Sequence, residues 1–305
     1  MHQIQLIRKY GIQPRKIIGQ NFLVDENIQR KIVALLDLKP ADRVLEIGAG
    51  LGALTGLLAG SGAKVFAVEK DKNLAGILKA ELERFPNLQV LNEDALKLDF
   101  GKLENGTRRR RRYKVVGNLP YFITTPILFF LIAERRWIEF ALIMVQKEFA
   151  ERFFAQPGTK SYGRLTLALR YHAEAAHAFD VSRHCFTPVP GVDSSLVRLK
   201  FRRRGVAGLD EELFFRAIQA AFASRRKNIL NALSHGLLEP AGPSEWDGPA
   251  SPSGHPPLGR AGLGREEWKT LLVGLGIPET KRAEELLLKD YIRLTFALQK
   301  RSQAR

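Results

Sequence analysis

Cysteine is almost missing from this sequence of 305 residues, in which Cys185 is the only one. A single thiol cannot form an internal disulfide, and it excludes a metal cluster built from several thiolates. We expect no metal cofactor. One reduced thiol fits a reducing intracellular compartment, so the expected location is cytoplasmic.

Long hydrophobic runs are also missing. The most apolar stretch is Ile123–Ala133, which is far shorter than the roughly 20 residues that cross a bilayer. The first fifteen residues carry Arg8, Lys9 and Arg15 without an acid, but they lack the serine-rich pattern of a transit peptide. We therefore interpret them as a basic arm and expect no membrane partner.

Acidic residues are scarce relative to basic ones. The sequence has 32 Asp and Glu against 48 Lys and Arg, for a net charge of +16. Such an excess favours a nucleic-acid or acidic-membrane partner. The hydrophobic fraction of 45% is ordinary, and the length predicts a folded protein of one or two domains.

The tetrad Asn118-Leu119-Pro120-Tyr121 follows the apolar run 113–117 and predicts a buried strand that ends in a stiff turn. The proline fixes its own φ and moves Leu119 away from the helical region. The Asn118 amide oxygen and the Leu119 carbonyl are two acceptors, and Tyr121 offers a flat aromatic face. This set suits the amino group of an adenine that has left its stack. Taken alone, the tetrad also fits an ordinary strand-end turn with a core tyrosine.

A glycine turn, Gly48-Ala49-Gly50-Leu51-Gly52, follows the predicted strand 43–47. Such a turn brings bare backbone against a ligand. The third glycine comes one residue too early for the dinucleotide fingerprint, and Glu46 would repel a pyrophosphate. An acid suits the sulfonium and the amine of S-adenosylmethionine. The turn therefore favours a methyl donor over a dinucleotide.

Two more acids stand at the ends of the next predicted strands. Glu69 follows strand 64–68, a position from which an acid bonds both ribose hydroxyls of an adenosine. Asp94, followed by Ala95, comes after strand 88–91 and could accept from the adenine amino group of the cofactor. Each acid alone is also explained as a solvated charge, but three acids at successive strand ends favour a cofactor site.

Two segments have two open interpretations each. Gln20-Asn21 precedes a predicted helix over 26–38, and it either lies over a bound ligand or only caps the loop. Phe186 begins the proline-containing segment 186–194. Its ring either stacks on a flipped base opposite Tyr121 or fills the core beneath the loop.

The composition changes near residue 205, where helical patterns replace strands. Residues 209–233 predict one helix that contains Arg225, Arg226 and Lys227. This cluster is either a grip for RNA phosphates or a solvated basic helix face. We therefore expect two domains: an α/β domain with the basic arm over 1–204, and a small all-α RNA-binding domain over 205–305.

Two segments interrupt this pattern. The loop 101–112 ends in five arginines, Arg108–Arg112, and either contacts phosphates or is a solvated insertion. It enters the tetrad strand from the edge opposite the tetrad, so we do not place it in the active site. Six prolines and six glycines within the 26 residues of Glu239–Gly264 predict a flexible insertion.

These segments, in this order, resemble the ribosomal RNA adenine N6,N6-dimethyltransferase family of the KsgA type. Any one motif is weak, but together they are specific and cover nearly the whole chain. The matching motifs are Gly19–Leu23, Glu46–Gly50, Asn118–Tyr121, Val145–Glu148, Phe186–Pro188, Val192–Ser194 and Arg225–Lys227. The resemblance implies a Rossmann-like class I S-adenosylmethionine-dependent methyltransferase sheet with a small all-α C-terminal domain.

The resemblance also implies the site and the reaction. It implies an S-adenosylmethionine site lined by Asn21, Leu23, Gly48, Glu69, Asp94 and Asn118. It implies dimethylation of two adjacent adenines in the 3′-terminal hairpin of small-subunit (16S) rRNA, with the small ribosomal subunit as partner. The family usually has Pro at Ala49, Asn at Phe122 and Lys at Gly191; Phe122 adjoins the target base and bears on rate and on mono- against dimethylation.

Two other functions stay open. A large-subunit rRNA adenine methyltransferase of the macrolide-resistance type shares the tetrad and the fold, although Gly19-Gln20 and the segment 186–190 favour the small subunit. A non-catalytic ribosome-assembly factor on the same fold is the second, and intact Asn118 and Tyr121 count against it. We expect a monomer, because no apolar stripe is left over.

Overall fold

The computed structural model divides the chain into two compact units. The first comprises Met1–Ala150 and Glu174–Phe201, and the second Glu151–Ala173 and Arg202–Arg305. The residues that the structure describes are 3–14, 19–103, 112–224, 226–236 and 263–303.

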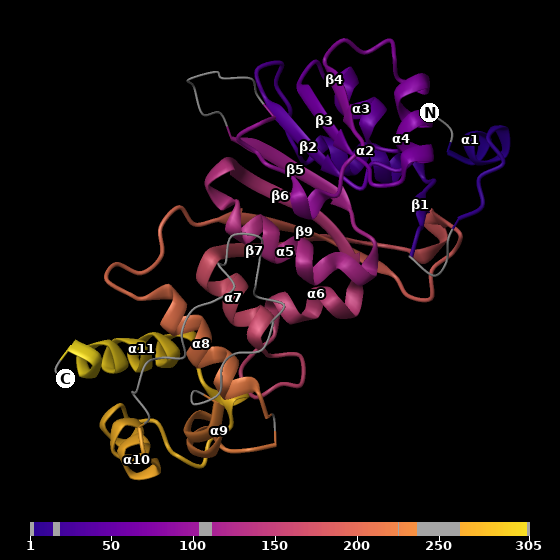
Figure 1. Ribbon diagram of the computed structural model, residues 1–305. Helices are drawn as coiled ribbons and strands as arrows, with labels where there is room; N and C mark the ends of the chain where they lie inside the picture. The colour runs from indigo at the N-terminus through magenta and orange to yellow at the C-terminus, as the bar shows by residue number, and fades with distance from the viewer. Residues whose placement is uncertain (1–2, 15–18, 104–111, 225, 237–262, 304–305) are drawn as a thin grey trace. The chain divides into compact units, whose positions relative to one another are not determined.

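A seven-stranded sheet forms the centre of the first unit (Figure 1). Its strand order is β4-β3-β2-β5-β6-β9-β7. The strands are β2 (Arg43–Ile47), β3 (Lys64–Val68), β4 (Leu88–Leu91), β5 (Tyr113–Asn118), β6 (Ile138–Gln146), β7 (Ala173–Val181) and β9 (Ser194–Phe201). Strands β2 to β6 are parallel to one another, and β9 is antiparallel to β6. The predicted Rossmann-like α/β sheet is therefore confirmed.

Helices and a small second sheet complete this unit. The helices are α1 (Gln3–Lys9), α2 (Glu26–Ala34), α3 (Thr55–Gly60), α4 (Lys72–Glu81) and α5 (Thr124–Ala133), and β1 (Phe22–Leu23) pairs antiparallel with β8 (Phe186–Thr187). Asp25 and Asp71 cap α2 and α4 by accepting two backbone N–H groups each, as their position before the helices predicts.

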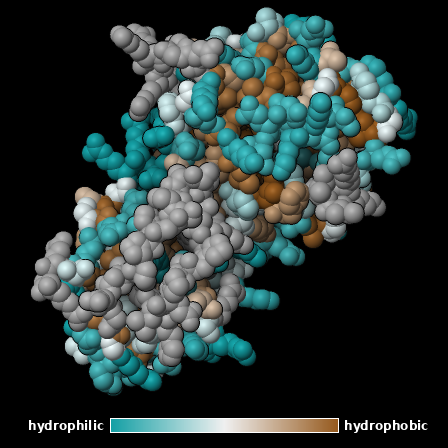
Figure 2. Space-filling model, in the orientation of Figure 1, coloured by the Kyte–Doolittle hydropathy of each residue, from teal (hydrophilic) through white to brown (hydrophobic). Residues whose placement is uncertain are grey.

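The apolar faces of these helices pack on the sheet. One core cluster joins Ile32 of α2 and Leu58 of α3 to Val65, Met144 and Leu196 of the strands, all at most 1% exposed. In Figure 2, brown hydrophobic residues show between teal hydrophilic ones over this unit. Burial of each such side chain stabilises the folded state by roughly 1.5–3 kcal/mol. The packed sheet therefore holds the ends of its strands at fixed positions.

The order of the strands fixes where a ligand can bind. The chain builds β3 and β4 on one side of β2, then crosses over to build β5 and β6 on the other side. In such sheets, ligands bind in the crevice outside the carboxyl ends of the strands at this reversal. Gly117 allows the close pairing there, because a Cβ on it would lie 2.9 Å from the Ile47 carbonyl oxygen.

The second unit is helical in its described part. Its helices are α7 (Arg164–His172), α8 (Glu211–Phe222), α9 (Ile229–Gly236), α10 (Arg265–Gly274) and α11 (Leu288–Gln303), while α6 (Lys147–Phe154) crosses the division between the units. Leu167 and Tyr171 of α7 share one buried cluster with Phe214 of α8, Leu272 of α10 and Leu294 of α11. This packing places 151–173 in the second unit, whereas the sequence-based division put everything before residue 205 in the first.

The structure has two helices where the sequence predicts one. Residues 209–233 were expected to form a single helix, but α8 ends at Phe222 and α9 begins at Ile229. Asn228 separates them, because its side-chain oxygen accepts from the Asn231 N–H at 2.9 Å and so starts a new helix. Arg226 and Lys227 therefore lie in an exposed loop rather than on a helix face.

Several predicted segments lie outside the described residues. They are Arg225, the arginine loop apart from 101–103 and Arg112, and the Pro/Gly-rich insertion apart from its end. Leu263 and Gly264 were assigned to that insertion, but Leu263 is buried in the core of the second unit and Gly264 precedes α10. Within the described ranges, no helix is long and apolar enough to cross a membrane.

Candidate active site at the carboxyl ends of β2 and β5

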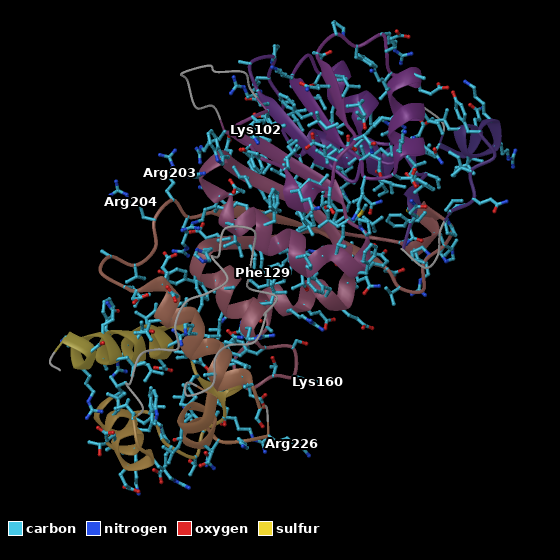
Figure 3. All side chains as sticks on the ribbon, in the orientation of Figure 1. Lys102, Phe129, Lys160, Arg203, Arg204 and Arg226 are labelled. Atoms are coloured by element: carbon cyan, nitrogen blue, oxygen red, sulfur yellow. The ribbon has the colours of Figure 1, made fainter. Side chains whose placement is uncertain are left out.

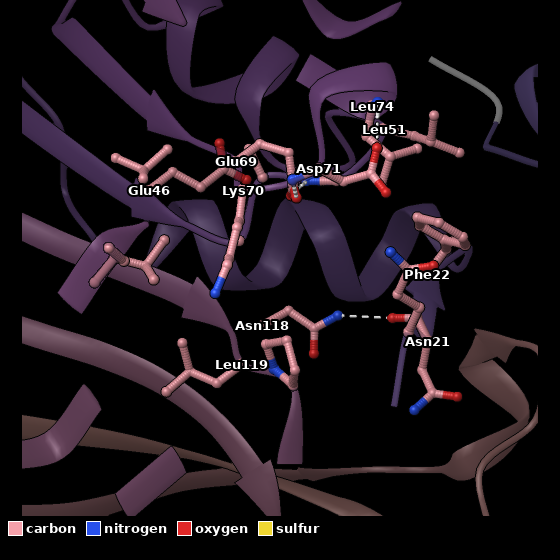
Figure 4. A pocket seen from close by; sticks show the side chains of 18 of the residues that line it. Asn21, Phe22, Glu46, Leu51, Glu69, Lys70, Asp71, Leu74, Asn118 and Leu119 are labelled. Carbon is pink, nitrogen blue, oxygen red and sulfur yellow. Dashed lines mark hydrogen bonds between the residues drawn. The ribbon is translucent and has the colours of Figure 1, made fainter. Parts of the chain in front are cut away.

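A cavity of about 540 Å³ lies at the reversal point, within the first unit. Its volume falls in the range of roughly 300–1,000 Å³ typical of small-molecule sites. Five segments that follow strands or precede them supply most of the lining (Figure 4): 19–23, 46–54, 68–74, 93–95 and 118–123. The topology therefore gathers residues from the first 123 positions of the chain into one site.

Glu69 closes the turn after β2. One carboxylate oxygen accepts from the Gly50 N–H at 2.8 Å and the other from the Asp71 N–H at 2.9 Å. Gly50 adopts φ +56° and Gly48 φ +73°, a left-handed conformation that favours glycine. Each oxygen of Glu69 keeps lone-pair capacity, so the pair can accept from the two hydroxyls of a ribose.

Glu46 is the second acid of the cavity, and it is 3% exposed. Its carboxylate accepts from the Thr55 hydroxyl at 2.6 Å. Burial raises the pKa of Glu46 to about 8, the Thr55 hydrogen bond opposes that rise, and the charge of Glu69 adds to it. A cation in the cavity would favour the ionised form of Glu46.

Asp94 lies at the far wall of the cavity, where it caps a short 3-10 helix by accepting from the Leu96 N–H at 3.1 Å. Its other carboxylate oxygen accepts from the Lys70 ammonium at 2.8 Å. Partial burial acts to raise the pKa of Asp94, but these two bonds outweigh it and hold the pKa below its usual value. Asp94 is therefore an ionised acceptor. Lys70, which follows Glu69, extends across the cavity (Figure 4).

The tetrad faces these acids across the cavity. The Asn118 amide nitrogen donates to the Asn21 carbonyl oxygen at 3.0 Å (Figure 4). That bond fixes the amide, and in the described part of the chain no group donates to its oxygen. The Leu119 carbonyl also receives no hydrogen bond from the described residues. Two fixed acceptors are therefore available for a ligand, as the tetrad predicts.

Tyr121 follows the tetrad's proline and is half-buried. Its hydroxyl lies 3.1 Å from the Ser194 hydroxyl at the start of β9. Burial raises the pKa of Tyr121, although the bond with Ser194 opposes the rise, so the ring stays neutral. The contact holds the ring in one orientation.

Phe186 does not reach the site, and the prediction that it stacks on a flipped base is wrong. It pairs with Leu23 across the β1–β8 ladder and is 1% exposed in the core cluster that also holds Met144 and Leu196. The cavity lining does not include it. In the structure, Phe186 is a core residue beneath the loop, as the other interpretation predicted.

Most of the predicted site residues do come together. The predicted residues that line the cavity are Gln20, Asn21, Leu23, Glu46, Gly48, Gly50, Glu69, Asp94, Ala95, Asn118, Leu119, Pro120 and Tyr121. Sequence reasoning missed Gln3 and Lys70 among the lining residues. The position of Lys70 directly after a strand-end acid could have indicated that it lines the cavity. No sequence signal pointed to Gln3, because α1 is distant in sequence from the other lining segments.

Four basic residues of the second unit are exposed. Arg226 and Lys227 lie in the loop between α8 and α9, and Arg203 and Arg204 follow β9 (Figure 3). Among the described residues these four side chains make no ion pair. They are therefore free to bind phosphates, but the cavity lining does not include them.

Comparison with known proteins decides the family. The sequence profile of the family "Ribosomal RNA adenine dimethylase" matches residues 11–241. The chain belongs to the ribosomal RNA adenine dimethylase family. The resemblance seen in its motifs is thereby confirmed.

Relatives of this dimethylase-family chain are similar over nearly its full length. "Ribosomal RNA small subunit methyltransferase A" of Pelotomaculum thermopropionicum is 40% identical over 94% of this chain and 92% of its own. The protein of the same name from Moorella thermoacetica is also 40% identical, over 97% and 96%.

Two solved structures share the fold. A dimethyladenosine transferase from Plasmodium falciparum superposes with a TM-score of 0.71 at 26% identity, covering 91% of this chain and 97% of its own. The 23S rRNA methyltransferase ErmE gives a TM-score of 0.61 at 26% identity, covering 91% and 99%. By name, the first is a dimethyladenosine transferase and the second a 23S rRNA methyltransferase, so the family and the seven-stranded methyltransferase fold agree.

Proposed function

We propose that this protein dimethylates the N6 amino groups of two adjacent adenines in the 3′-terminal hairpin of small-subunit rRNA, with S-adenosylmethionine as methyl donor. The observation that carries the proposal is the fixed Asn118 amide oxygen opposite two buried acids in one cavity. The names of the relatives, at about 40% identity over most of the chain, support the small subunit as target.

The cavity fits the methyl donor by its chemistry. Two buried acids, Glu46 and Glu69, suit a ligand with a sulfonium and an amine. Glu69 would hold the ribose hydroxyls, and Asp94, ionised at the far wall, would accept from the adenine amine. When bound, S-adenosylmethionine supplies an electrophilic methyl group. Positive φ at Gly48 and Gly50 lets the backbone approach the methionine portion closely.

The tetrad would hold the target adenine. Asn118 and the Leu119 carbonyl accept hydrogen bonds from its N6 hydrogens, and Tyr121 stacks on the flipped base. This arrangement aims the nitrogen lone pair at the methyl group, and positioning of this kind lowers the barrier without a strong base. The amine proton becomes acidic only as the new bond forms, so water can take it up.

The second unit would hold the rRNA. The whole chain has a net charge of +16, and the exposed Arg203, Arg204, Arg226 and Lys227 of this unit supply phosphate contacts. We place Arg225 in the same group by its position in the sequence. We also propose that the protein is a cytoplasmic monomer, and sedimentation experiments would measure its mass. We further propose that it has a role in small-subunit biogenesis.

The test changes the acceptor that Asn118 supplies. Asn118→Ala should lower turnover at least about 100-fold, in line with the loss of a fixed acceptor at a reacting centre, and leave the dissociation constant of the methyl donor near that of the wild type. Asn118→Asp keeps an acceptor oxygen and should retain more turnover than Asn118→Ala. Wild-type turnover in Asn118→Ala would refute the assignment.

A further inference from the structure

Phe122 is an exposed aromatic residue at the cavity. It lies in the 3-10 turn Tyr121–Ile123 directly after the tetrad, lines the cavity, and is 62% exposed. The two other described aromatic residues in the lining are held by the fold. Phe22 is 7% exposed and packs with Leu6, and Tyr121 is tied to Ser194.

Phe122 has little packing on the described part of the chain. At 62% exposure, most of its side chain stays in water. Isolated exposed apolar residues are common on protein surfaces, so its position is what matters. The backbone of Gly19 packs against this turn: a Cβ there would lie 3.7 Å from the Tyr121 nitrogen and 4.0 Å from Phe122 Cδ1. The loop before β1 therefore supports the turn and leaves most of the ring open.

Phe122 and Tyr121 point in different directions. Successive residues of a 3-10 turn are rotated by about 120° about its axis, since it has three residues per turn. This rotation directs the two side chains away from the turn in different directions. If Tyr121 stacks on the target adenine, the ring of Phe122 is presented to a different base.

We propose that Phe122 stacks on the base next to the flipped adenine and so helps to hold the rRNA hairpin loop. This rests on the proposed function. Extruding a base leaves its neighbour without a stacking partner on one side, and aromatic side chains bind unstacked RNA bases in loops. Phe186 cannot serve, because it is buried in the core.

The first test is kinetic and uses small subunits that lack the adenine methylation. Phe122→Ala should raise the KM for subunits about 5- to 150-fold, which corresponds to the roughly 1–3 kcal/mol of one base–aromatic stack at 1.4 kcal/mol per factor of ten. The kcat and the dissociation constant of the methyl donor should stay near wild-type values. Phe122→Trp keeps an aromatic ring at this position, so its KM should stay near that of the wild type. Leu35, an apolar residue of the first unit at 40% exposure that does not line the cavity, gives the control, and Leu35→Ala should leave the KM unchanged.

The second test is spectroscopic and needs no turnover. In Phe122→Trp, binding of a hairpin RNA with two adjacent adenines should quench the new tryptophan fluorescence, measured as the difference from the wild type. A KM unchanged in Phe122→Ala, or no quenching at saturating RNA, would overturn the stacking role. If the wild type transfers no methyl group to small subunits, the proposed function fails, and the quenching result still decides the stacking.

Discussion

Methyl-donor binding should depend on pH through Glu46. This side chain is 3% exposed in the cavity wall, and burial raises its pKa to about 8. Near neutral pH, most molecules of the free protein therefore carry a protonated Glu46. A cationic donor binds best when Glu46 is ionised, because an opposite charge favours the charged form.

The direction and the size of this pH dependence follow from the pKa of Glu46. A carboxyl with a raised pKa must lose its proton for the donor to bind, so affinity increases with pH until the pH exceeds about 8. Between pH 6 and pH 7 the ionised fraction, and with it the association constant, should increase about ninefold. The amine of the donor stays protonated in that interval, because the pKa of an α-amino group is about 8.

Titration calorimetry at pH 6 and pH 7 measures this dependence, and a comparison of buffers with different ionisation enthalpies counts the protons released. The wild type should release close to one proton per donor bound. Glu46→Gln should bind more weakly, lose most of the pH dependence and release almost none. The pKa of Glu69 is also raised by burial, so Glu69→Gln is the second variant. Equal pH profiles for Glu46→Gln and the wild type would refute the reasoning.

Two further predictions concern elements around the site. Leu6 of α1 packs on Phe22, Leu51 and Leu74, which line the cavity, so Leu6→Ala should weaken donor binding about tenfold through a lost packing contact. Calorimetry checks this, and an unchanged affinity would show that this packing does not support the donor site. The Lys114 ammonium, on a side chain 9% exposed, donates to the Leu36 carbonyl and to Asp42 at 2.9 and 2.8 Å. Lys114→Met should lower the free energy of unfolding by about 3 kcal/mol, measured by urea denaturation, and a loss below about 1 kcal/mol would contradict it.

The buried parallel strands were predictable from sequence. Strands β2 and β5 are buried on both faces, and most of Arg43–Ile47 and Tyr113–Gly117 is apolar, with the charged exceptions Arg43, Glu46 and Lys114. Such mostly apolar short runs are typical of buried parallel strands. The residues at their carboxyl ends then follow from topology, because parallel strands end at one edge of the sheet. This is why Glu46, Glu69 and Asn118 could be assigned to one cavity before the structure was known.

Other elements carried no such signal. Strand β7 has the alanine-rich sequence of Ala173–Val181 and is mostly exposed at the sheet edge. It lacks a clear alternation, and Val181 is its one β-branched residue. The break between α8 and α9 depends on one capping residue, Asn228, directly after a basic run. Phe186 was misplaced because its direction is set by the register of two-residue strands, which the sequence does not encode locally.

The most direct test of the central claim is transfer of labelled methyl groups from S-adenosylmethionine to purified ribosomal subunits that lack these modifications, followed by digestion to nucleosides. The account predicts N6,N6-dimethyladenosine from small subunits alone. Label in large-subunit rRNA would indicate the macrolide-resistance type of activity. No label in either subunit, with the donor still bound, would contradict catalysis and favour an assembly factor on the same fold.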